Sequence, residues 1–492
     1  MADNQDYYVL LGIFRDATRE EIKKAYLKAA QRLHPDKNEA PGETEMFLDV
    51  QKAYDTLSDA AQRAKYDATL PDENEHLSPI VQRISYSRSN LVRLDETQLV
   101  YALLEWKPRQ QKDKVLSPPL NVCLVLDRST SMRHEKMDMV KAAALHLLRG
   151  LREQDIFSVV TFSDHAEVVI PASVQMDRLR MESKIHQMIP SGATELFKGL
   201  QAGVKEVRKH LAKERVNHVV LLTDGHTYGD EEKCLQLAEE ATESGIGISG
   251  LGIGKDWNDL FLDELAGKTG SSSIYIAEPR EIQRFLEEKF AELTKVFAEN
   301  VTLTFEQGEG IDLKYAFRLH PNSGPVSVSS PMQLGVILQD TPLSILLEFV
   351  VYPSVLMEDV ANLLQGMMKF SIPMKPLPPQ PLRVRLYRPV LEAASSEPPP
   401  VFIIQALANL NFYRLQEKAR ADVDAGNEDV ASRRLHFLAT NLLDRGEKKL
   451  AQTVLLEAEH LQRMNSLSKD GYKNIKYGTR ALLLPSQKGE SL

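Results

Sequence analysis

Apolar residues in the first seventy positions recur at helical spacing and predict two amphipathic helices. The first stripe is Ile22, Tyr26, Ala29, Ala30 and Leu33. The second stripe is Phe47, Val50, Ala53, Tyr54 and Leu57. Pro35 ends the first helix, because proline cannot donate to the helical hydrogen-bond ladder and restricts the residue before it. Two antiparallel helices joined by a polar loop therefore close over a small core.

Strand-like and helix-like segments alternate from residue 120 onward. Strands are expected at 122–126, 157–162, 216–223, 246–252 and 273–277. Amphipathic helices are expected between them, for example at 137–151, 196–211 and 233–244. This alternation predicts a mostly parallel sheet wrapped by helices, and such sheets bind ligands at the carboxyl ends of their strands.

Period-two alternation on both sides of this α/β unit predicts further strands. They lie within residues 78–108 and, after the unit, near 301–305, 336–338, 344–351 and 382–387. Because strands flank the α/β unit on both sides, we expect one β-sandwich assembled from the two flanks.

Beyond Pro398-Pro399-Pro400 the pattern becomes helical again. Apolar stripes predict three helices, near 407–415, 431–443 and 450–461. The basic segment 473–480 is interpreted as a short docking or capping piece. The tail is therefore expected to form a helical hairpin or bundle that packs on a neighbour.

The fold class that these patterns predict is multidomain α+β. An all-α N-terminal domain precedes a Rossmann-like α/β domain inserted in a β-sandwich, and a helical tail follows. The expected boundaries are 1–70 for the first helical domain, 78–116 and 297–392 for the two parts of the sandwich, 117–296 for the α/β domain and 401–484 for the tail.

Length, net charge and cysteine content limit the classes of protein to which the chain can belong. At 492 residues the chain is too long for one core, and a formal net charge of −9 argues against nucleic acid or an anionic membrane as the main partner. Two cysteines, Cys123 and Cys234, are too few for a disulfide framework. The polar N-terminus and the lack of a long apolar run predict a cytoplasmic protein.

Oxygen-bearing side chains follow two predicted strands and precede one predicted helix. The segments are Asp127-Arg128-Ser129-Thr130-Ser131, Ser191-Gly192-Ala193-Thr194 and Thr223-Asp224-Gly225. Burying an acid and hydroxyls at a strand end is costly unless a ligand uses their lone pairs. Hydroxyl and carboxylate oxygens suit a hard cation such as Mg²⁺ or Mn²⁺.

Four ordered segments of the N-terminal domain resemble the J-domain of DnaJ-type co-chaperones. They are Asp6-Tyr7-Tyr8-Val9-Leu10-Leu11-Gly12, His34-Pro35-Asp36-Lys37-Asn38, the segment 51–59, and Arg63-Ala64-Lys65-Tyr66-Asp67. The resemblance spans nearly all of residues 6–67. It implies that a DnaK-type chaperone docks on the His34-Pro35-Asp36 loop and the basic face of the preceding helix, and that ATP hydrolysis is triggered there. The chaperone-binding residues so implied are His34, Pro35, Asp36, Lys23, Lys24, Lys28 and Arg32.

The α/β unit resembles a von Willebrand factor A domain with a metal-ion-dependent adhesion site, in the arrangement of bacterial-type multi-domain proteins. The run 121–132 resembles the family's first strand and Asp-x-Ser-x-Ser loop, and Thr194 and 221–225 match its later motifs. The resemblance implies that Ser129, Ser131 and Thr194 approach a Mg²⁺, Mn²⁺ or Ca²⁺ ion directly or through water. It implies that Asp127 and Asp224 orient bound waters, and that an acidic side chain of a partner protein completes the coordination. Thr130 departs from the family pattern, in which glycine is common.

Sequence patterns that are typical of enzymes occur in this chain, but the predicted elements around them do not suit their chemistry. Gly245-Ile246-Gly247-Ile248-Ser249-Gly250 fits G-x-G-x-x-G, but it leads from a helix into a strand, whereas dinucleotide binding needs the reverse order. No nucleophile–base pair is recognisable either, so a non-catalytic protein is expected.

Two functions follow as hypotheses. In the first, the chain is a co-chaperone or scaffold that recruits a DnaK-type ATPase and captures a client protein through a metal-bridged carboxylate. In the second, it is a metal-dependent adaptor for an AAA+ ATPase, with an auxiliary J-domain. A pull-down separates them, because retention of a DnaK-type chaperone should depend on Asp36, and retention of a ring ATPase on Asp224.

Overall fold

The structure is a computed structural model of the chain. It describes residues 7, 11, 17, 19–33, 43–59, 62–63, 66, 78–109, 117–174, 177–225, 229–375, 381–395 and 399–483. The chain divides into two compact units, Met1–Leu77 and Ser78–Leu492.

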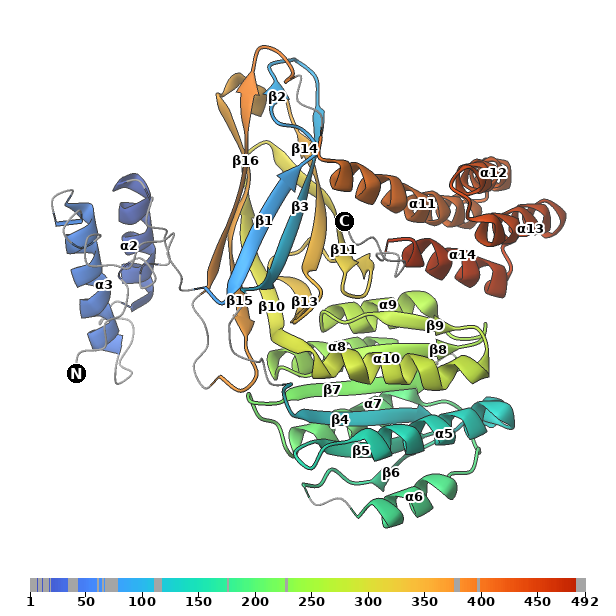
Figure 1. Ribbon diagram of the computed structural model, residues 1–492. Coiled ribbons are helices and arrows are strands. Elements are labelled where there is room, and N and C mark those ends of the chain that lie inside the picture. The colour runs from blue at the N-terminus through green and yellow to red at the C-terminus, as the bar shows by residue number, and fades with distance from the viewer. Residues whose placement is uncertain are drawn as a thin grey trace. The chain divides into compact units, whose positions relative to one another are not determined.

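The N-terminal unit is built on a pair of helices, α2 (Arg19–Leu33) and α3 (Glu43–Ser58) (Figure 1). Tyr26 of α2 stacks on Tyr54 of α3, with ring centroids 4.2 Å apart. The buried core comprises Leu11, Ala17, Ile22, Val50, Ala53 and Leu57. These include positions of both predicted apolar stripes, so the prediction of a helix pair is confirmed.

Two five-stranded sheets form a β-sandwich in the second unit (Figure 1). One sheet has the order β1-β3-β14-β11-β12 and the other β13-β10-β15-β16-β2. The first flank supplies β1 (Ile80–Tyr86), β2 (Leu91–Val92) and β3 (Gln98–Pro108). The second flank supplies β10 (Val296–Gln307), β11 (Ile311–His320), β12 (Gly324–Pro325), β13 (Met332–Leu338), β14 (Leu343–Val351), β15 (Val360–Ser371) and β16 (Leu382–Leu391).

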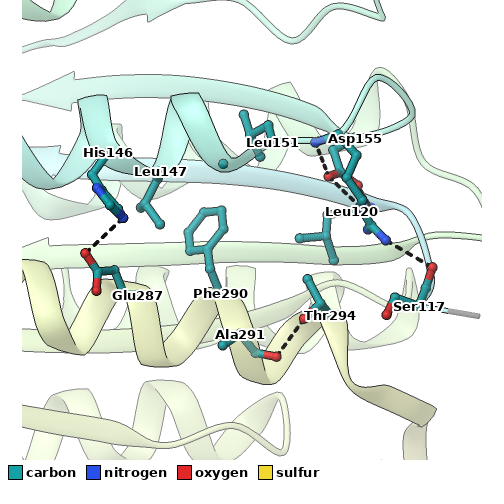
Figure 2. A pocket seen from close by; sticks show the side chains of 12 residues that line it. Ser117, Leu120, His146, Leu147, Leu151, Asp155, Glu287, Phe290, Ala291 and Thr294 are labelled. Atoms are coloured by element: carbon teal, nitrogen blue, oxygen red, sulfur yellow. Dashed lines mark hydrogen bonds and ion pairs between the residues drawn. The ribbon is translucent and has the colours of Figure 1, made fainter.

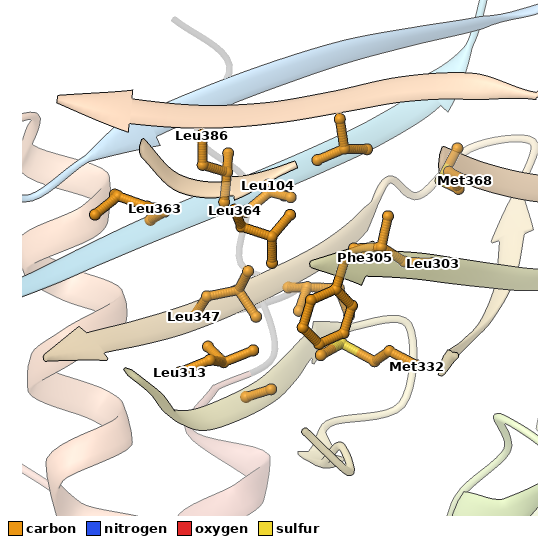
Figure 3. Close-up of a cluster of buried hydrophobic side chains, with 14 of the residues drawn as sticks. Leu104, Leu303, Phe305, Leu313, Met332, Leu347, Leu363, Leu364, Met368 and Leu386 are labelled. Atoms are coloured by element: carbon orange, nitrogen blue, oxygen red, sulfur yellow. The ribbon is translucent and has the colours of Figure 1, made fainter. Parts of the chain in front are cut away.

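Direct pairing between the flanks makes the α/β unit an insertion in the sandwich. Strand β3, from before the unit, pairs antiparallel with β14, from after it, and Leu104 lies opposite Ile345. Leucines of both sheets meet in the core that Figure 3 shows, among them Leu347 from one sheet and Leu303 and Leu386 from the other. Each buried leucine stabilises the fold by about 1.5–3 kcal/mol relative to an exposed one. The two flanks therefore share one hydrophobic core, as the alternation predicts.

The inserted unit has a six-stranded sheet with the order β6-β5-β4-β7-β8-β9. Its strands are β4 (Leu120–Asp127), β5 (Ile156–Phe162), β6 (Ala166–Ile170), β7 (Val216–Thr223), β8 (Gly247–Ile253) and β9 (Ser273–Ile276). All neighbours are parallel except β5 and β6, which pair antiparallel. The five predicted strands are present, and the edge strand β6 is an addition.

Helices cover both faces of this sheet. One apolar layer lies under α5 (Glu135–Gly150), α6 (Arg178–His186) and α10 (Ile282–Thr294). The other lies under α7 (Leu196–Arg208), α8 (Glu231–Glu243) and α9 (Asp259–Lys268). Cys123 and Cys234 are buried free thiols of the second layer, and burial raises the pKa of Cys123 to about 12.

Four helices form the C-terminal region, α11 (Val401–Asp424), α12 (Glu428–Asp444), α13 (Lys448–Met464) and α14 (Lys469–Ala481). Tyr413 of α11 packs on Phe317 of the sandwich. The predicted docking segment 473–480 is part of a full helix, α14, and its Lys476 and Arg480 pair with Asp263 of α9. Within the described ranges, no helix combines the length and the apolar character needed to cross a bilayer.

Candidate metal centre

Three polar segments meet at the carboxyl edge of the six-stranded sheet. Asp127 is the last residue of β4, and Ser129 and Ser131 lie in the loop that follows. Asp224 comes directly after β7, which is the neighbour of β4. Thr194 lies two residues before α7 begins. Because β4 and β7 run parallel, their ends bring residues almost a hundred positions apart to one edge.

Hydrogen bonds join these segments into one network. Asp127 accepts a hydrogen bond from the backbone N–H of Ser129 at 2.8 Å through Oδ1, and one from the Thr223 hydroxyl at 2.7 Å through Oδ2. The Oγ atoms of Ser129 and Ser131 lie 2.9 Å apart. Ser131 in turn donates to Oδ1 of Asp224 at 2.7 Å. Four of the five residues predicted to form the metal site thus lie in one hydrogen-bonded network.

Both carboxylates of the network are withdrawn from solvent. Asp127 is 0% exposed and Asp224 is 2% exposed. Burial raises the pKa of Asp127, while hydrogen bonds from Ser129 and Thr223 act in the opposite direction. The second oxygen of Asp224 forms an ion pair with the Lys136 ammonium. Buried carboxylates are costly unless positive charge or donors surround them, so this edge of the sheet favours a cation.

The fifth predicted residue, Thr194, lies beside the segment that follows β7. A Cβ atom added to Gly225 would stand only 3.3 Å from the Thr194 Oγ1. The loop before Thr194 is fixed to the β4 loop by a backbone hydrogen bond from Ser191 N to Arg128 O at 2.7 Å. The hydroxyl of Thr194 is therefore close to the segment that contains Asp224 and Gly225.

The chemistry of this donor set fits a hard divalent cation. It consists of three hydroxyls and two carboxylates, with neither sulfur nor imidazole among the predicted ligands. In the part of the chain that the structure describes, no three His, Cys, Asp or Glu side chains gather into a metal-binding group. Oxygen ligands completed by water are the ligation that Mg²⁺ prefers, so the hydroxyls of this edge would suit that ion.

Two charged neighbours of the site were missed by motif-based reasoning. Lys136 lies in the first turn of α5. Its position directly after the polar loop was the one feature of the sequence that could have indicated its place beside the site. Asp164 accepts a hydrogen bond from the backbone N–H of Ala193 at 2.8 Å and so holds the loop that carries Thr194. No spacing or motif in the sequence marks Asp164 for this position.

The predicted chaperone-binding surface is described only in part. Lys23 and Lys24 are exposed on α2, and Ile22 beside them is buried in the helix-pair core. The side chains of Lys28 and Arg32 and the residues His34, Pro35 and Asp36 lie outside the described residues. The arrangement of Ile22, Lys23 and Lys24 agrees with a basic face opposite a buried stripe.

A pocket of about 390 Å³ opens between α5 and α10, as Figure 2 shows. Leu120 and Phe290 contribute apolar lining, and His146 Nε2 lies 3.2 Å from Glu287 Oε1 at one side. Leu120 begins the strand that Asp127 ends, so the pocket is at the opposite edge of the sheet from the candidate metal centre. None of the predicted site residues lines it.

Comparisons with protein families find matches in three parts of the chain. The family model of the DnaJ domain matches residues 6–67, that of the von Willebrand factor type A domain matches 121–290, and that of the Sll0103-like, C-terminal alpha-helical domain matches 402–485. The uncharacterized protein sll0103 of Synechocystis sp. is 27% identical over 384 residues, which cover 75% of this chain and 89% of that protein. The chaperone protein DnaJ of Methanosarcina thermophila is 52% identical over 67 residues, or 14% of this chain and 17% of that protein.

A solved structure shares the fold of most of the second unit. The von Willebrand factor type A protein from Catenulispora acidiphila aligns with a TM-score of 0.64 at 15% identity and covers 83% of this chain and 98% of its own. At this identity the likeness concerns the fold alone. Together with the family models, it shows that the chain carries an N-terminal DnaJ domain, a central von Willebrand factor type A domain and a C-terminal helical domain.

Proposed function

We propose that the chain is a non-catalytic co-chaperone or scaffold that recruits a DnaK-type chaperone and captures a second protein through a divalent metal ion. The DnaJ domain supports a DnaK co-chaperone role, and the von Willebrand domain supports protein interaction. Both kinds of domain are typically non-catalytic. The observation that carries the proposal is the occurrence of a DnaJ domain and a convergent set of hydroxyl and carboxylate oxygens in one chain.

In this proposal Ser129, Ser131 and Thr194 hold Mg²⁺ directly or through water. Ser131 suits this task because its hydroxyl donates to Asp224. The Ser129 hydroxyl is then the donor in the 2.9 Å contact with Ser131, which leaves one lone pair of Ser131 free for a metal. Asp127 and Asp224 orient bound waters and offset the charge of the ion. When bound, the ion supplies a Lewis-acidic position that a partner carboxylate can occupy.

Linking the two activities in one chain has a physical consequence. A protein held by the von Willebrand domain is kept near the chaperone that the DnaJ domain recruits, so its encounter with the chaperone becomes effectively intramolecular. The chain lacks the Gly/Phe-rich linker and the repeated Cys-x-x-Cys motifs that follow the J-domain in full-length DnaJ proteins. We therefore assign client selection to the von Willebrand domain.

The chaperone arm is tested by steady-state ATP hydrolysis of a DnaK-type chaperone in the presence of the full chain. We expect stimulation by the wild type and none by Asp36→Asn or His34→Gln, with Asp224→Ala as a control that still stimulates. Equal stimulation by the wild type and Asp36→Asn would refute the co-chaperone role. The capture arm is tested by partner retention with Mg²⁺ and with EDTA.

A further inference from the structure

Lys136 places a positive charge inside the candidate metal centre. It lies in the first turn of α5 (Glu135–Gly150), and its ammonium pairs with Oδ2 of Asp224. The Lys136 side chain is 30% exposed, whereas that of Asp224 is 0% exposed. Lys136 is thus the partly exposed partner of an ion pair whose other partner is buried.

The ion pair uses the carboxylate that the proposed metal also needs. Oδ1 of Asp224 accepts the Ser131 hydroxyl, and Oδ2 faces Lys136. Asp127 and Asp224, when ionised, present two negative charges, and the ammonium offsets one of them. A divalent ion bound by Ser129 and Ser131 would lie near this ammonium. Repulsion between the two positive charges is screened less beside these two buried carboxylates than between fully exposed charges.

We propose that Lys136 is a tethered cation that competes with the divalent metal ion for Asp224 and lowers the affinity of the site for the free ion. The inference rests on the proposed function, because it assumes that the site binds a metal. Metal binding requires the Lys136 ammonium to leave Asp224 or to remain beside a second positive charge. Either requirement lowers affinity. The long lysine side chain is partly exposed, so rotation about its own bonds can make this exchange without movement of the backbone.

A purely structural role for Lys136 makes the opposite prediction. If the ammonium only stabilised the buried Asp224 carboxylate, its removal would leave metal affinity unchanged or reduce it by disturbing the site. An increase in metal affinity on removal of the charge would therefore indicate that Lys136 competes with the metal ion. No change or a decrease would indicate that Lys136 only stabilises Asp224.

The test is a titration of the full chain with Mn²⁺, with free Mn²⁺ measured by electron paramagnetic resonance. Lys136→Met removes the charge, and Lys136→Gln removes it but keeps a hydrogen-bond donor for Asp224 should the first variant fold poorly. Lys136→Arg keeps the charge. Lys141→Met removes one charge from the same helix at a position where Nζ donates to the backbone oxygen of His186 instead.

We expect the neutral Lys136 variants to bind Mn²⁺ about tenfold or more tightly than the wild type, the range by which outer partners of a metal site alter its affinity. Lys136→Arg and Lys141→Met should stay near the wild-type value. Unchanged or weaker Mn²⁺ binding by both neutral variants would overturn the competition and leave the metal site standing. Absence of Mn²⁺ binding in the wild type and every variant would overturn the metal site and the inference together.

Discussion

The hydroxyl groups of Ser129 and Ser131 link the β4 loop to Asp224 in the candidate metal centre. Their Oγ atoms are 2.9 Å apart, and the Ser131 hydroxyl donates a hydrogen bond to Asp224. The Asp-x-Ser-x-Ser string made both serines predictable, as did the Thr-Asp-Gly string for Asp224. Lys136 was not predictable in the same way, because a lysine in the first turn of a helix usually faces solvent. Only the fold places its ammonium on the carboxylate at the end of β7.

Replacing Ser129 with alanine tests the hydroxyl directly. Ser129 is 2% exposed, whereas its neighbour Thr130 is exposed. We expect Ser129→Ala to weaken binding of Mg²⁺ strongly, because an oxygen ligand is lost, and to cost no more than about 1 kcal/mol of unfolding free energy. Thr130→Ala is the matched control and should bind Mg²⁺ like the wild type. Titration calorimetry measures the Mg²⁺ affinity of the wild type and of both variants. Equal affinities of the wild type and Ser129→Ala would show that Ser129 is not a ligand.

Helix α14 illustrates at the scale of elements why composition can mislead. Its segment Lys473–Arg480 is basic in sequence and was interpreted as a short docking or capping piece, and Lys473, Lys476 and Arg480 are all buried. Lys476 Nζ lies 2.8 Å from an oxygen of Asp263 in α9, and Arg480 Nη1 lies 2.8 Å from the other. Helical periodicity is recognised from apolar stripes. A helix that packs through buried ion pairs has a weaker apolar stripe, so the pattern does not reveal its full length. The docking role of this segment was expected, but its length as a helix was not.

Loss of Arg480 should loosen the C-terminal helices. Burial alone would raise the pKa of Asp263, but Arg480 and Lys476 hold that pKa well below its usual range. Arg480→Ala leaves a buried carboxylate with one cation fewer, which costs about 3 kcal/mol or more. Lys469→Ala, on the same helix, breaks only an exposed pair with Asp256 and should cost less than about 0.5 kcal/mol. Denaturant unfolding distinguishes the two, and equal losses would contradict this account of the interface.

The same ion pairs predict a dependence on pH. A carboxylate with a lowered folded-state pKa contributes stability above its unfolded pKa, near 4, and loses that contribution as the pH falls toward the folded value. Acid should therefore weaken the attachment of α14 to α9.

Exposed lysines of α2 in the DnaJ domain are expected to speed association with a DnaK-type chaperone. Reversing two charges with Lys23→Glu and Lys24→Glu leaves the buried Ile22 in place. We expect slower, less salt-sensitive association with a DnaK-type chaperone, because exposed charges steer encounters over about 8 Å at physiological salt. Lys52→Glu, an exposed change on α3, is the control. Stopped-flow association at two salt concentrations measures the effect, and identical rates for all variants would assign the α2 face to solvation alone.

At the scale of the whole molecule, alternation on both flanks predicted a sandwich interrupted by an α/β unit. The strands that the pattern missed have specific reasons for their weak signal. Register shifts interrupt β11 between Leu313 and Tyr315 and β15 between Asn362 and Leu364, and each shift breaks the period of two. Strand β6 lies at a sheet edge and is largely exposed, so it has no alternating buried face. The sequence pattern is strong where one regular face is buried, and weak where a bulge or an edge removes that condition.

The proposed function joins metal-dependent capture of a protein to recruitment of a chaperone in one chain. The most direct measurement is affinity capture by the immobilised full chain, with Mg²⁺ or with EDTA, in the wild type, Asp224→Ala and Asp36→Asn. We expect a DnaK-type chaperone to be retained in a way that needs Asp36 and is insensitive to EDTA. We expect a second protein to be retained only with both Mg²⁺ and Asp224. Retention of the second protein at an unchanged level in EDTA, or by Asp224→Ala, would contradict the claim.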